Sequence, residues 1–140
     1  MSPDVAIRAL AALAFLACVA LVAVAARRIV AHRRDRVLAA PAHPDLAIGR
    51  LTILYFHGDR CSDCVVQERE LDVILTARPE IAIRADHAPS ALSRRFGVLT
   101  VPTTVVLDGA GRARAVNYGL TARDVLERQL GEVSTLEQTA

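Results

Sequence analysis

The sequence has almost no net charge of either sign. Its 17 lysine and arginine residues are nearly balanced by 15 aspartate and glutamate residues, which leaves a formal charge of +2 at pH 7. So small a charge, with arginines that are not interleaved with exposed aromatic residues, argues against a nucleic-acid-binding protein. The chain also lacks internal repeats, and its 140 residues hold one compact domain at most, with some length left for an anchor or a tail.

Long apolar runs are also absent, with one exception near the amino terminus. The segment from Ala9 to Ala26 contains no charged residue and, at ~1.5 Å per helical residue, covers ~27 Å of the ~30 Å hydrocarbon core of a membrane. A cleaved signal peptide is the alternative, but its positive charge would precede the apolar core. We therefore predict a transmembrane anchor helix over residues 5–26. The basic residues follow it instead: Arg27, Arg28, His32, Arg33, Arg34 and Arg36.

The basic cluster also predicts an orientation. Arginines close to a membrane span stay on the cytoplasmic side, so a single-pass protein of the cell membrane is expected with its amino terminus outside and its domain in the cytoplasm. Because a single-span protein can depart from this bias, the opposite orientation, with an extracytoplasmic domain, is an alternative. Residues 27–48 are expected to form a basic linker in which Pro41 and Pro44 discourage regular structure.

The remaining sequence predicts a small α/β domain over residues 49–131, followed by a polar tail at 132–140. The apolar run 51–56 is typical of a strand covered on both faces. A helix is expected after it, with Cys64 and Leu71 on the buried face and Gln67 and Glu68 on the solvent face. The expected order is β-α-β-α-β-β-α, with further strands at 81–86, 103–107 and 112–117 and a last helix that ends at Gly131.

The chemistry concentrates at Cys61-Ser62-Asp63-Cys64. Two cysteines three apart at the start of a helix can close a small disulfide, and the helix amino terminus favours a thiolate on the first. A thiolate attacks a partner's disulfide, and the second cysteine resolves the mixed disulfide. Half of a zinc site is an alternative, but zinc needs two more ligands, and His57, His87 and Cys18 are the candidates. An inert structural pair is a third interpretation.

Two motifs in register resemble the thioredoxin family. The first is strand 51–56 followed by the cysteine pair at a helix start, and the second is Phe96-Gly97-Val98 leading into Val101-Pro102-Thr103. Gly119 resembles the glycine after the family's last strand. The resemblance implies a minimal thioredoxin fold, a four-stranded mixed sheet with flanking helices, behind one amino-terminal transmembrane helix.

The resemblance also assigns roles to residues. Cys61 would be the nucleophile, Cys64 the resolving thiol, and Pro102 a cis-proline that leaves the Val101 backbone free to pair with an extended substrate strand. Arg60, Ser62 and Asp63 would join Val101 and Pro102 in binding substrate. No metal and no cofactor are implied.

Departures from the family lie close to the motif. Tyr55 occupies the position where the family often buries an acidic residue, so the control of the thiol pKa values must differ. His57 is a candidate for proton transfer, with a solvated loop histidine as the alternative. Arg60 would favour a Cys61 thiolate, whereas Asp59 and Asp63 would oppose it.

These observations predict a membrane-anchored thiol–disulfide oxidoreductase, a disulfide reductase or electron relay. The resemblance implies a bacterial protein. Its partners would be protein thiols and disulfides, with a thioredoxin reductase-like or membrane electron donor. Two alternatives stay open. One is a binding module on the thioredoxin scaffold, whose cysteines only tune partner contact. The other is an extracytoplasmic thiol reductase of the cytochrome-maturation type.

Overall fold

The computed structural model describes residues 3–139 and divides the chain into two compact units, Met1–Asp35 and Arg36–Ala140. The first unit is helical throughout its described residues and belongs to α1, which spans Pro3–Ala39. Within residues 3–139, α1 is the one helix long and apolar enough to cross a membrane, a property that membrane spans and signal sequences share. Its large apolar side chains, such as Leu10, Phe15 and Leu21, are exposed.

The helix is longer than the predicted anchor. It continues through the basic residues to Ala39, because residues 27–39 contain neither proline nor glycine. A short 3-10 helix, η1 (Pro44–Leu46), follows. Val37 and Leu46 are 7% and 3% exposed and pack in the core of the second unit. The segment expected to be a linker at 27–48 therefore contributes both helix and core, and the domain begins at Arg36 rather than Gly49.

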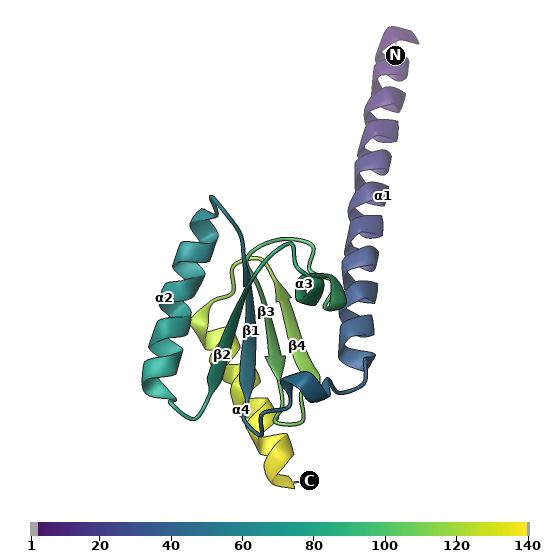
Figure 1. The fold of residues 1–140 in the computed structure, drawn as a ribbon. Coiled ribbons are helices and arrows are strands. Elements are labelled where there is room, and N and C mark those ends of the chain that lie inside the picture. Colours follow the sequence, from purple (N-terminus) through teal and green to yellow (C-terminus); the bar gives the residue numbers. More distant parts are fainter. Residues whose placement is uncertain (1–2, 140) are drawn as a thin grey trace. The chain divides into compact units, whose positions relative to one another are not determined.

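The second unit is built on a four-stranded mixed sheet in the order β2-β1-β3-β4 (Figure 1). Strand β1 (Thr52–His57) pairs in parallel with β2 (Ala82–His87) and antiparallel with β3 (Thr103–Leu107). Strand β4 (Ala113–Tyr118) is antiparallel to β3, with an irregularity near Leu107. The element order from β1 onward agrees with the predicted β-α-β-α-β-β-α, and the predicted four-stranded mixed sheet with flanking helices is confirmed.

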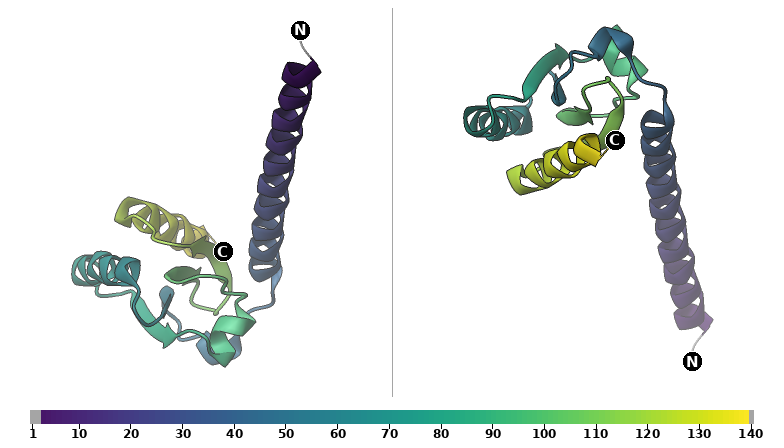
Figure 2. Two further views of the ribbon diagram at one scale, coloured as in Figure 1. Left: turned by 90° about the horizontal axis from the view of Figure 1, so that it is seen from above. Right: turned by 90° about the horizontal axis from the view of Figure 1, so that it is seen from below.

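Apolar residues on both faces of the strands give the sheet two cores. Helices α2 (Ser62–Ala77) and α4 (Arg123–Thr139) cover one face, where Ile53 and Tyr55 are buried. Helix α3 (Ala91–Arg95) lies on the other side, where Leu54 and Phe56 are buried. The views along the strands show α2 and α4 side by side (Figure 2).

Two expectations about the helices are wrong. Gln67 is fully buried instead of facing solvent. Helix α4 continues past Gly131 to Thr139, so residues 132–139 are not a loose polar tail. The reason is the spacing of Leu126, Leu130 and Val133, which keeps one face of α4 buried for a further turn.

Candidate active site

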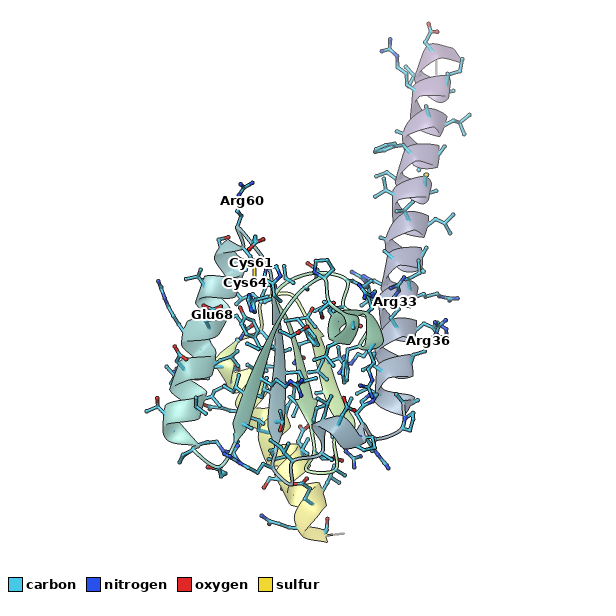
Figure 3. The ribbon with its side chains drawn as sticks, in the orientation of Figure 1. Arg33, Arg36, Arg60, Cys61, Cys64 and Glu68 are labelled. Atoms are coloured by element: carbon cyan, nitrogen blue, oxygen red, sulfur yellow. A yellow bond between two sulfur atoms is a disulfide. The ribbon has the colours of Figure 1, made fainter. Side chains whose placement is uncertain are left out.

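The cysteine pair lies where β1 passes into α2. Strand β1 ends at His57, the loop Gly58–Arg60 follows, and Cys61 is the N-cap residue of α2. Cys61 and Cys64 form a disulfide with their Cα atoms 5.2 Å apart. Figure 3 shows the pair at the edge of the domain, at the amino-terminal end of α2. The disulfide therefore joins the N-cap residue of α2 to a residue in the first turn of the same helix.

The two sulfur atoms have different surroundings. The backbone N–H of Cys64 donates to Cys61 Sγ over 3.1 Å, so this sulfur takes the place of an N-cap oxygen. The positive end of the helix dipole at this position stabilises a thiolate once the disulfide is reduced. Cys61 is partly exposed, whereas Cys64 is only 3% exposed. An incoming disulfide can therefore reach Cys61 more readily than Cys64.

The loop that precedes the pair is shaped by close packing. A Cβ on Gly58 would lie only 3.1 Å from Cγ2 of Val101, so this position requires glycine or a shift of that valine. Arg60 adopts a left-handed conformation with φ of 52°, which few residues other than glycine do. Its exposed side chain extends away from the disulfide (Figure 3).

A second loop, ending at β3, packs beside the pair. The Val101–Pro102 peptide bond is cis, Pro102 is buried, and Val101 packs against the same apolar cluster as Cys61. The N–H of Gly119 donates to the Pro102 carbonyl oxygen over 2.8 Å, which ties the segment after β4 to this loop. The structure therefore brings Cys61 and Val101, 40 residues apart in sequence, against one apolar cluster, where β1 ends and β3 begins.

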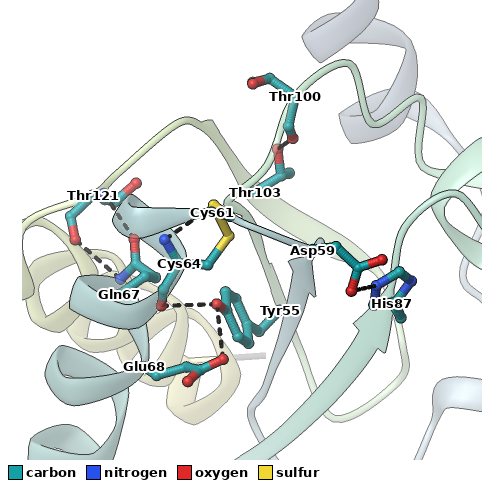
Figure 4. The surroundings of a disulfide bond; sticks show 10 residues. All are labelled: Tyr55, Asp59, Cys61, Cys64, Gln67, Glu68, His87, Thr100, Thr103 and Thr121. Carbon is teal, nitrogen blue, oxygen red and sulfur yellow. Dashed lines mark hydrogen bonds and ion pairs between the residues drawn. A yellow bond between two sulfur atoms is a disulfide. The ribbon is translucent and has the colours of Figure 1, made fainter.

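A tyrosine and a glutamate lie below the disulfide. The hydroxyl of Tyr55 is 3.0 Å from the carbonyl oxygen of Cys64 and 3.3 Å from Oε1 of Glu68 (Figure 4). That hydroxyl has one proton and two neighbouring acceptors. It can therefore donate to the Cys64 carbonyl or to the Glu68 side chain, one at a time. Burial, and then the nearby Glu68 carboxylate, raise the pKa of Tyr55 far above its ordinary value of 10.0.

Glu68 and Gln67 are site residues that sequence reasoning missed. Both were expected on the solvent face of α2. The Gln67 amide donates to the carbonyl oxygen of Thr121 over 3.1 Å and accepts from its N–H over 2.8 Å. These two bonds clamp the segment after β4 onto α2, one turn from Cys64 (Figure 4). The sequence pointed to this role only through the position of Gln67, three residues, or about one helical turn, after Cys64.

Two histidines lie at the ends of adjacent strands. The ring of His57 stacks on that of Tyr55, with the ring centroids 5.5 Å apart. It also packs edge-to-face with the ring of His87, with the centroids 5.2 Å apart. His87 Nε2 lies 3.2 Å from Oδ1 of Asp59 in the loop before Cys61. The predicted proton-transfer residue therefore belongs to a polar cluster beside the motif. Among residues 3–139, no three His, Cys, Asp or Glu side chains are grouped to hold a metal ion.

The other expected substrate-binding residues surround the pair. Ser62 and Asp63 are exposed in the first turn of α2, next to Arg60 and the disulfide. The carboxylate of Asp63 is favourably placed at the positive end of the helix dipole. The structure thus brings together all the predicted site residues: Cys61, Cys64, His57, Arg60, Ser62, Asp63, Val101 and Pro102.

Solved structures share this fold. A thioredoxin-like protein from Clostridium perfringens is 29% identical, with a TM-score of 0.56 over 61% of this chain and 71% of that one. Thioredoxin-2 of the malaria parasite, part of its protein secretion machinery, is 21% identical with a TM-score of 0.56 over 59% and 82%. Mitochondrial thioredoxin 3 of Saccharomyces cerevisiae is 16% identical with a TM-score of 0.56 over 64% and 85%. No family model matches the sequence, and no curated protein matches it.

The fold, the CxxC pair at disulfide distance and these relatives support a thiol–disulfide oxidoreductase. The domain has a thioredoxin-like fold, and its redox pair is consistent with a thioredoxin-family protein.

Proposed function

We propose that the protein is a membrane-anchored disulfide reductase or electron relay in which Cys61 attacks and Cys64 resolves. The observation that carries this proposal is the position of Cys61 Sγ. It belongs to the more exposed cysteine of the pair, it accepts the Cys64 N–H at the amino terminus of α2, and Cys61 packs against the same apolar cluster as Val101, next to Pro102. A thiolate at this position is both stabilised and accessible.

The reaction balances without a bound cofactor. The Cys61 thiolate attacks one sulfur of a substrate disulfide, which forms a mixed disulfide and releases the other substrate sulfur as a thiolate. The Cys64 thiolate then attacks Cys61 Sγ, closes the protein disulfide and releases the second substrate sulfur, which takes up a proton. Two electrons pass from the protein to the substrate. A thioredoxin reductase-like enzyme or a membrane electron donor would return them to the Cys61–Cys64 pair.

The substrate would be an extended segment of a protein. By the family resemblance, that segment would lie along the backbone of Val101 and beside Pro102, and Arg60, Ser62 and Asp63 would flank it. His57 is proposed to exchange a proton with the solvent near the pair, since it is half-buried at the end of β1.

Catalysed reduction of insulin disulfides by dithiothreitol tests the activity. The full chain in neutral detergent should accelerate the reaction, and Cys61→Ser should abolish the acceleration. The binding-module alternative predicts no acceleration by either protein, and binding of a partner that survives Cys61→Ser.

The location is tested separately. Helix α1 and the basic residues after it support a single-pass anchor with the domain in the cytoplasm. In intact cells treated with an impermeant reductant and then an impermeant maleimide, Cys61 and Cys64 should stay unlabelled until lysis. Labelling before lysis would place the domain outside the cytoplasm and would favour the exported-thiol reductase.

A further inference from the structure

A groove of about 620 Å³ lies between α2 and the segment that joins β4 to α4. Its apolar lining comes from Val66, Leu120 and Ala122. Val66 and Leu120 are 41% and 46% exposed, which is high for large apolar side chains of a small domain. Exposed apolar side chains that line a concave surface are typical of sites that bind a partner.

The groove begins next to the redox pair. Val66 follows Cys64 by two residues in α2, and Thr121, which also lines the groove, is clamped to α2 by the two bonds from Gln67. Figure 4 shows Gln67 and Thr121 beside Cys61 and Cys64. Gly119, which precedes Leu120, also donates its N–H to the Pro102 carbonyl oxygen, so the groove lining is tied to the loop proposed to hold the substrate.

The charged lining of the groove is mostly acidic. Glu70, Asp124 and Glu127 contribute three carboxylates, and Arg123 contributes one guanidinium group. Arg123 Nε lies 3.8 Å from Glu70 Oε2 and 4.0 Å from Glu127 Oε1. One positive charge against three negative charges leaves a net charge of −2. A ligand with positive charge and an apolar side chain complements this lining.

We infer that the groove binds a basic segment of the disulfide substrate, with arginine or lysine near the reacting cysteine and an apolar residue that packs on Val66 and Leu120. The inference rests on the proposed function and adds a substrate class to it. Attraction to the groove brings the substrate disulfide to Cys61 and stabilises the encounter before the sulfur–sulfur bond is exchanged.

The test uses two synthetic peptides that share one internal disulfide and one apolar residue and differ only in flanking residues, two arginines or two glutamates. The full chain, reduced and held in neutral detergent, is mixed with each peptide, quenched in acid and analysed for peptide dithiol. The wild-type protein should reduce the basic peptide about three- to tenfold faster than the acidic one, as expected for a few partly screened ion pairs. The ratio should shrink in 0.5 M NaCl, where the Debye length is only about 4 Å.

Two double variants localise the effect. Asp124→Asn with Glu127→Gln removes two groove carboxylates and should bring the ratio close to one. Asp72→Asn with Glu132→Gln removes the same charges from exposed positions outside the groove and should keep the wild-type ratio. Equal rates for both peptides with the wild-type protein, or equal loss of the ratio in both variants, would overturn the inference. Failure to reduce either peptide would instead contradict the proposed function.

Discussion

The phenolic hydroxyl of Tyr55 lies 3.3 Å from Oε1 of Glu68, and the same hydroxyl is 3.0 Å from the carbonyl oxygen of Cys64. Tyr55 is only 2% exposed, whereas Glu68 is on the solvent side of α2. The pair therefore links the buried backbone at Cys64 to a carboxyl side chain on the solvent side of α2. Tyr55 occupies the position where the family resemblance leads us to expect a buried acidic residue. Its hydroxyl instead contacts the carboxyl group of Glu68 from α2.

Replacement of Tyr55 by phenylalanine should destabilise the oxidised protein. The change removes one hydroxyl, and with it the hydrogen bond that this hydroxyl donates to the Cys64 carbonyl or to Glu68, at a cost of about 0.5–1.5 kcal/mol in the free energy of unfolding. Urea unfolding of the full chain in neutral detergent, followed by circular dichroism, measures it. Glu68→Gln keeps an acceptor near the hydroxyl and should cost less. Equal stability of Tyr55→Phe and the wild-type protein would show that these bonds contribute nothing.

Alkaline pH should destabilise the protein through Tyr55. The pKa of Tyr55 is raised in the folded state above its ordinary value of 10.0, so above about pH 10 the unfolded chain releases a proton that the folded chain keeps. This contribution to stability is complete below that pH and is lost as the pH rises further. Urea unfolding at pH 8 and pH 11 should show a larger fall for the wild-type protein than for Tyr55→Phe. The same fall in both proteins would refute this assignment.

Gln67→Leu should be among the most destabilising single substitutions near the site. Leucine fits the volume but leaves the N–H and C=O groups of Thr121 without the two bonds of the amide, and each unsatisfied buried group costs about 1–3 kcal/mol. Gln138→Leu makes the same chemical change at an exposed position of α4 and should cost less than about 0.5 kcal/mol. Comparable urea midpoints for the two variants would mean that the clamp is unimportant.

The end of α1 should stabilise the domain. Val37 is 7% exposed in the core that contains Phe56 and Phe96, so Val37→Ala should lower the free energy of unfolding by about 1–3 kcal/mol. Val30→Ala, at a 41% exposed position of the same helix, should change it by less than about 0.5 kcal/mol. If both variants unfold like the wild-type protein, then the domain does not need the last turn of α1.

Strands and the redox pair could be predicted from local sequence because both signals are local. The apolar runs before the cysteines and after Pro102 are β1 and β3, and a CxxC spacing at a helix start determines where the disulfide lies. The extension of α4 could not be predicted because a glycine after a run of helical residues is typical of a helix end. The helix continues through Gly131 because Leu126, Leu130 and Val133 keep one of its faces buried.

Gln67 and Glu68 could not be predicted because their partners are distant in sequence. A polar residue at a helix position indicates solvent unless its hydrogen-bond partners are known, and Thr121 is 54 residues from Gln67. Tyr55 likewise reaches Glu68 only because β1 and α2 pack against each other. Long-range polar contacts depend on side-chain direction, which composition and periodicity do not contain.

Trapping of the mixed disulfide tests the central claim most directly. In a Cys18→Ser background, the reduced Cys64→Ser protein is mixed with a peptide disulfide, quenched in acid and analysed by mass spectrometry. We predict that a covalent adduct accumulates on Cys61, since the more exposed sulfur at the start of α2 attacks and no resolving thiol remains. The matched Cys61→Ser protein should form little or no adduct. An adduct that forms on Cys64 in that variant, with none on Cys61 in the first, would contradict the account.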